Sequence, residues 1–147
     1  MVSITQTTAL LVAFLNLLAG AWGGLRWWQV EQSRGAWLAI RGAQIGAALF
    51  ALLAGAFYVA GMRPADGLFW LYVLLPVAVG FVAEQLRLVS AETVLEARGL
   101  PDAQALGELD DAAQQSVVTA ILRRELGVMA LACLVTCFLA LRAHGTL

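Results

Sequence analysis

Four long apolar stretches divide the chain, and charged residues gather mainly between them. The stretches cover residues 9–28, 36–61, 67–83 and 126–141. Each is close to the roughly 20 residues that a helix needs to cross a hydrocarbon core of about 30 Å. We therefore predict an all-α fold, an integral membrane four-helix bundle with one spanning helix for each stretch.

The third and fourth helices are predicted to continue beyond the membrane. No helix breaker follows residue 84 until Gly99 and Pro101, which are typical of a glycine C-cap and a proline stop. Asp102 is placed to cap a short turn ending near Gly107, and helix-forming sequence then runs over residues 112–143. Residues 84–125 should therefore form a cytoplasmic helical hairpin, about two to four turns long.

The composition supports lipid as the main solvent. The chain is 61% hydrophobic and 13% charged, whereas a soluble domain carries roughly 25% charged residues. Its 147 residues leave room for one transmembrane domain and one modest excursion. The net charge of −1 implies no general attraction to nucleic acid.

Arginine placement predicts the orientation. All nine basic residues are arginines, and seven of them fall in or beside the first and third loops. These seven are Arg26, Arg34, Arg41, Arg87, Arg98, Arg123 and Arg124, against Arg63 and Arg142 on the opposite side. By the positive-inside rule, residues 29–35 and 84–125 should be cytoplasmic and both termini should lie outside.

Small residues recur every four positions along the second stretch. This ladder consists of Gly35, Ala39, Ala43, Ala47, Ala51 and Gly55, with Gly42 and Gly46 beside it and Gly20 and Gly24 in the first stretch. Small residues let helix backbones approach closely in lipid. The ladder predicts either packing inside the bundle or an interface with a second copy or another membrane subunit.

Charged residues at the inner ends of the third and fourth helices form a second candidate site. Glu84 and Arg87 should face Arg123, Arg124 and Glu125 across the antiparallel pair. We expect Glu84 to pair with Arg123 or Arg124, and Arg87 with Glu125, as a structural clamp. Because ionisable groups at membrane depth are costly, an ion or proton pathway through Glu84 is the alternative.

Asn16 and Gln44 are the two amides well inside the bundle, and interhelical hydrogen bonding is the common use of such residues. A pathway for ions or polar solutes would need further polar side chains aligned with these two amides. Met129, Cys133 and Cys137 form a sulfur stripe that we interpret as apolar filling, so no metal is expected.

Familiar enzyme motifs are missing from the sequence. The single histidine, His144, cannot supply paired axial haem ligands, and no HExxH or CxxC motif occurs. We expect neither catalysis nor a cofactor.

Three segments carry a family resemblance: residues 83–88 (AEQLRL), 94–99 (VLEARG) and 120–129 (AILRRELGVM). They resemble uncharacterised small four-helix membrane proteins from high-GC bacteria, over roughly residues 66–143. The resemblance implies a bacterial plasma membrane and transfers no catalytic or binding residues.

The leading functional expectation is a non-enzymatic accessory or scaffold subunit that packs against other membrane helices. One alternative is a small homodimeric transporter or channel that uses Asn16, Gln44 and Glu84. Another is a bundle that binds lipid or a small hydrophobic molecule, with Pro76 and Gly80 opening a lateral groove. Membrane lipids, other subunits or a second copy are the expected partners.

Overall fold

The computed structural model describes residues 1–31 and 33–147, and this part of the chain is entirely helical apart from short links. The helices are α1 (Val2–Gln29), α2 (Arg34–Val59), α3 (Leu68–Leu88), α4 (Ser90–Ala97), α5 (Ala103–Gly107) and α6 (Asp111–His144). Four of them, α1, α2, α3 and α6, are long and apolar enough to cross a membrane, which confirms the predicted fold class at this level. The predicted loop 29–35 includes Gln32, which lies outside the described residues.

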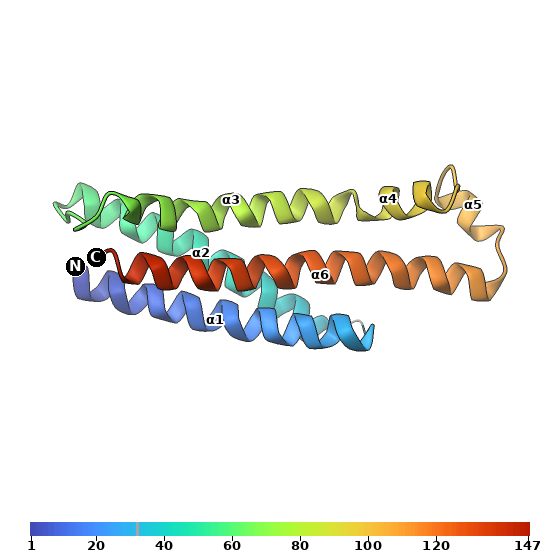
Figure 1. Cartoon of the computed structure of the whole chain (residues 1–147), viewed down its shortest axis with the longest axis horizontal. Coiled ribbons are helices and arrows are strands. Elements are labelled where there is room, and N and C mark those ends of the chain that lie inside the picture. Colours follow the sequence, from blue (N-terminus) through green and yellow to red (C-terminus); the bar gives the residue numbers. More distant parts are fainter. Residues whose placement is uncertain (32) are drawn as a thin grey trace.

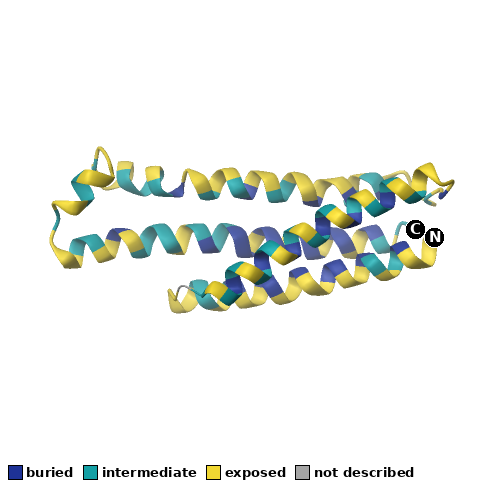
Figure 2. Cartoon of the chain, turned by 180° about the vertical axis from the view of Figure 1, so that it is seen from behind, coloured by how far each residue is buried: buried dark blue, intermediate teal, exposed yellow. Residues whose placement is uncertain are grey.

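Helix α6 is the centre of the bundle. It lies between α1 and α3, and both chain termini are at the same end of the molecule (Figure 1). Helix α2 crosses the other helices obliquely, from the end of α1 to the start of α3 (Figure 2). In the most apolar segment of α6, 50% of the residues are buried, whereas the share is 22% in α2 and in α3. The outer helices therefore expose most of their apolar surface, as expected of helices in lipid.

Two hydrophobic clusters form the core. The cluster nearer the termini contains Phe50, Phe69 and Val73 together with buried alanines of α1 and α6. The cluster nearer the loops contains Ile40, Met129 and Cys133. Cys137, the last residue of the sulfur stripe, belongs to the cluster nearer the termini. All three sulfur side chains are thus core residues.

Glycine allows α1 and α6 to approach closely. A Cβ atom added at Gly20 would lie 2.9 Å from Leu134 Cγ, and one added at Gly23 would lie 3.2 Å from Ala130 Cβ. Dense packing of this kind replaces the hydrophobic driving force that is missing between helices in lipid. These two glycines therefore set the α1–α6 spacing.

Helix α6 extends past the end of α1, and α4 continues the line of α3 beside it, with α5 at the turn between α4 and α6 (Figure 1). Gly99 has a φ of 68°, and the N–H groups of Gly99 and Leu100 donate to the carbonyls of Glu96 and Leu95, each at 3.0 Å. This pair of bonds is the Schellman motif that glycine favours. The Asp102 carboxylate accepts a hydrogen bond of 2.8 Å from the Ala105 N–H. The predicted glycine cap and aspartate cap are both confirmed.

The expectation of one unbroken helix from the membrane to Arg98 is wrong. Helix α3 ends at Leu88, and α4 begins at Ser90 after a single intervening residue, Val89. The Ser90 hydroxyl donates to the Leu86 carbonyl at 2.8 Å, and the residue is fully buried. Back-bonding serines favour helix bends, and this one lies at the junction of α3 and α4.

Overpacking the α1 side of the core should destabilise the protein. Ala13 is 3% exposed within the core cluster, whereas Ala21 is exposed on the same helix. We expect Ala13→Leu to lower the free energy of unfolding by about 1–3 kcal/mol. Thermal or denaturant unfolding in detergent measures the change. Ala21→Leu is the matched control, and equal stability of the two variants would contradict the α1–α6 packing described.

Candidate functional site

A cavity of about 200 Å³ lies among the four long helices. Each helix contributes one polar side chain to its wall: Asn16 from α1, Gln44 from α2, Glu84 from α3 and Thr136 from α6. Pro76 and Gly80, the residues expected to open a lateral groove, line the same cavity. The fold therefore gathers at one place the three polar residues that the sequence singled out on three separate helices.

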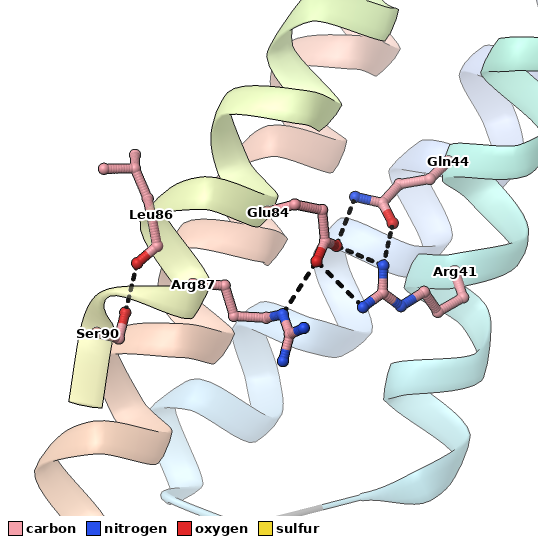
Figure 3. A network of polar contacts seen from close by, with 6 residues as sticks. All are labelled: Arg41, Gln44, Glu84, Leu86, Arg87 and Ser90. Carbon is pink, nitrogen blue, oxygen red and sulfur yellow. Dashed lines mark hydrogen bonds and ion pairs between the residues drawn. The ribbon is translucent and has the colours of Figure 1, made fainter. Parts of the chain in front are cut away.

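Glu84 is held by three side chains (Figure 3). Arg41 binds it through both carboxylate oxygens, with Nη1–Oε1 at 2.5 Å and Nη2–Oε2 at 3.2 Å. Arg87 Nε donates to Oε2 at 3.1 Å, and Gln44 Nε2 donates to Oε1 at 3.4 Å. A fork-like arginine contact of this kind fixes direction as well as charge. The network joins α2 to α3 and, with two guanidinium groups on one carboxylate, carries a net charge of +1.

The expected partners of Glu84 were wrong. Among the described residues, Arg123, Arg124 and Glu125 form no ion pair, and Arg87 pairs with Glu84 in its own helix instead of with Glu125. The reason is the oblique course of α2, which brings Arg41 next to α3 (Figure 3). The Arg123 guanidinium lies 5.1 Å from the centre of the Trp27 ring, so it is turned toward α1.

Asn16 bonds between helices, as its position suggested. Its side-chain nitrogen donates to the Val12 carbonyl at 2.9 Å and to the Ala43 carbonyl of α2 at 3.4 Å. The residue is 1% exposed. Because both contacts use the nitrogen, the side-chain oxygen remains an acceptor at the cavity wall.

Thr136 was not among the candidates from the sequence, although it is 5% exposed and lines the cavity. A threonine hydroxyl in a membrane helix usually bonds to its own backbone, so its presence alone carries no signal. The neighbours of Thr136 along α6 are apolar, and only the fold places it beside Asn16 and Glu84.

The small-residue ladder is divided between the inside and the outside of the bundle. Ala43 and Ala47 are buried, and a Cβ added at Gly35 would lie 2.7 Å from the Trp22 ring. No atom of the described residues lies within 4 Å of a Cβ added at Gly42, Gly46, Gly55 or Gly24, and Ala51 is half-buried. Part of the ladder packs internally, and the glycines beside it remain uncovered.

Arginine–aromatic contacts mark two levels along the bundle. Near the termini, Arg63 lies 4.6 Å from the Tyr58 ring centre and Arg142 lies 5.6 Å from that of Tyr72. Near the loops, Arg87 lies 5.7 Å from the Trp37 ring centre, and Arg123 lies over Trp27. Aromatic rings paired with cations are typical of the two interfaces of a membrane.

Comparison of this chain with protein-family models, curated proteins and solved structures finds no match. Within the described residues, no group of three or more His, Cys, Asp or Glu side chains is arranged to hold a metal ion. The function has to be inferred from the side chains of this chain and their geometry.

Removing the charge of Glu84 should leave two arginines without their counter-charge and with one acceptor oxygen in place of two. The Glu84 side chain is 23% exposed, so water compensates only partly. We expect Glu84→Gln to reduce the free energy of unfolding by about 1–3 kcal/mol. The double variant with Arg41→Gln should recover part of this loss, because it removes one unpaired cation.

Detergent unfolding of the four members of this double-mutant cycle measures the coupling between the two residues. Glu96→Gln is the matched control, since Glu96 is an exposed carboxylate on α4. Strictly additive effects of the Glu84 and Arg41 variants would show that the contact does not stabilise the fold.

Proposed function

We propose that the protein is a multi-pass protein of the bacterial plasma membrane with both termini outside. The distribution of arginines supports this orientation, since seven of nine lie at the end of the bundle that carries loops 29–35 and 84–125. In this frame the hairpin of α4, α5 and the first turns of α6 lies in the cytoplasm.

Its role, in our proposal, is that of a non-enzymatic accessory or scaffold subunit that associates with other membrane helices or with a second copy. One observation carries the proposal: Gly42 and Gly46 of α2 form a G-x-x-x-G motif with open space above both glycines. Gly42 also lines a hollow of about 360 Å³ between α1 and α2. Leu38, Ile45 and Leu49 surround the motif and are 73%, 60% and 59% exposed. A shallow notch between large apolar side chains is the geometry at which two membrane helices pack closely.

The buried alanines of the ladder have a different role. Ala43 and Ala47 already contact the core, so they fix α2 on the bundle. Gly42 and Gly46 lie about 100° around the helix from them, on a flank with open space above it. A substitution at Ala47 would therefore test folding, whereas one at Gly42 or Gly46 tests association.

Leucine at Gly42 and Gly46 should abolish association and leave the monomer folded. A Cβ at either position meets no atom of the described residues within 4 Å, and glycine is a weaker helix former than leucine. We expect Gly42→Leu/Gly46→Leu to remove the partner or dimer peak in native mass spectrometry after gentle extraction. The unfolding midpoint should be unchanged or slightly higher.

Gly55→Leu is the matched control, because Gly55 is an equally open glycine of α2 outside the motif. The proposal is wrong if the Gly42/Gly46 double variant keeps the same associated species as the wild-type protein.

The cavity favours a second candidate function, transport of a small ion or polar solute. Its four polar side chains come from four helices, and one of them, Glu84, is held in place by Arg41 and Arg87. Charged groups at membrane depth that line a cavity are typical of solute pathways.

Flux through this cavity should depend on its wall. In proteoliposomes, we expect Glu84→Gln to change the rate of ion or solute efflux several-fold, and Thr136→Val to do so without disturbing the ion pairs. Glu96→Gln reports on a carboxylate remote from the cavity and should behave as wild type. Absence of flux above that of empty liposomes for chloride, phosphate, sodium, potassium and protons would contradict ion transport through this cavity.

A further inference from the structure

A groove between α1 and α6 lies at the end of the bundle that carries the loops. Its volume is about 530 Å³, and apolar positions form its lower part: Gly24 of α1 and Gly127, Val128, Leu131 and Leu134 of α6. Trp27, Arg123 and Arg124 form its mouth. A second hollow of about 390 Å³ shares these three mouth residues and continues toward Val94 and Ala120. The mouth is therefore open to the medium above it and to the groove below it.

The mouth carries positive charge. Arg123 and Arg124 are both exposed, and neither forms an ion pair within the described residues. Three other arginines at this end of the bundle are already paired: Arg26 with Glu31, and Arg41 and Arg87 with Glu84. Arg123 and Arg124 both line the groove, and the guanidinium group is well suited to bind a phosphate-like anion.

The groove has the length of one lipid chain in one leaflet. Leu134 follows Arg124 by ten residues, which corresponds to about 15 Å along a helix. This distance is half of the roughly 30 Å hydrocarbon core. A phosphate at the arginines would therefore place an acyl chain along the groove as far as the membrane midplane.

Two glycines keep the groove open. A Cβ added at Gly24 would meet no atom of the described residues within 4 Å, so the absence of a side chain there leaves an empty trough on α1. A Cβ added at Gly127 would lie 2.9 Å from Trp27 Nε1, so this glycine lets the indole lie against the α6 backbone. The Trp27 ring, with Arg123 over its face, then forms one side of the mouth.

We propose that this groove binds one anionic glycerophospholipid, with the headgroup phosphate at Arg123 and Arg124 and an acyl chain between α1 and α6. Basic pockets between membrane helices at an interface bind anionic lipid headgroups in this way. The site is separate from the polar cavity and from the G-x-x-x-G face of α2, and it does not require either proposed function.

Native mass spectrometry of the full-length protein in detergent, titrated with phosphatidylglycerol or phosphatidylcholine, tests the proposal. The wild-type protein should prefer phosphatidylglycerol, and Arg123→Gln/Arg124→Gln should weaken its binding roughly 30-fold, from about one factor of five for each arginine near the membrane surface. Gly24→Leu should fill the groove and weaken binding of both lipids while the preference for phosphatidylglycerol persists. Inorganic phosphate at the lipid concentration should displace neither lipid, because it lacks the chain.

Arg34→Gln/Arg98→Gln is the control, since it removes the same charge from exposed positions at the same end of the bundle. This control should bind phosphatidylglycerol as the wild-type protein does. Equal phosphatidylglycerol binding by the Arg123/Arg124 variant and the wild-type protein overturns the proposal, as does displacement of the lipid by phosphate. A dimer that disappears in Gly24→Leu, with lipid binding unchanged, would assign the groove to a second copy instead.

Discussion

The close contact between α1 and α6 is the constraint on which the rest of the structure depends. In lipid, apolar side chains gain nothing by leaving the solvent, so helices stay together through dense packing and specific polar contacts. Gly20 and Gly23 bring the two backbones together in the middle of the bundle, and buried alanines of both helices continue the contact toward the termini. Helix α6 thereby becomes the buried axis on which α3 packs from the other side (Figure 1). Without that axis, α2 and α3 would have little common surface.

Helix α2 explains both the cavity and the ion-pair network. It crosses the bundle obliquely (Figure 2), and the cavity lies between it and the other three long helices. The same course brings Arg41 against Glu84 at one end of that space (Figure 3). The three side chains are partly exposed, at 43% for Arg41, 23% for Glu84 and 26% for Arg87, and each charged group has an opposite charge beside it. The network is thus a polar junction between α2 and α3, and its carboxylate is the charged group of the cavity wall.

The sequence was sufficient to predict the helices and their caps, but it did not predict which arginine pairs with Glu84. Apolar length, the Gly99–Pro101 stop and the Asp102 cap are local signals, and the structure confirms the helices and caps that they predict. The interruption at Val89 was missed, because the sequence around it contains no helix breaker and a single serine is compatible with a helix. Glu84 was correctly recognised as needing a cation. Its actual partner depends on the crossing direction of α2, which no periodicity in the sequence specifies.

The individual contacts of the arginines could not be predicted from the sequence either. Their distribution along the chain predicts an orientation, because the positive-inside rule depends only on the side of the membrane on which each arginine lies. Their individual roles depend on neighbours from other helices: Arg41 and Arg87 hold a carboxylate, Arg63 and Arg142 lie over tyrosine rings, and Arg123 lies over Trp27. A guanidinium on an aromatic face still has its N–H donors directed outward, so it remains able to bind an anion. Arg123 and the adjacent Arg124 are therefore the cations at the loop end that have both a hydrogen-bonding capacity to spare and an apolar groove beneath them. That combination distinguishes a lipid site from the general positive charge of a cytoplasmic surface.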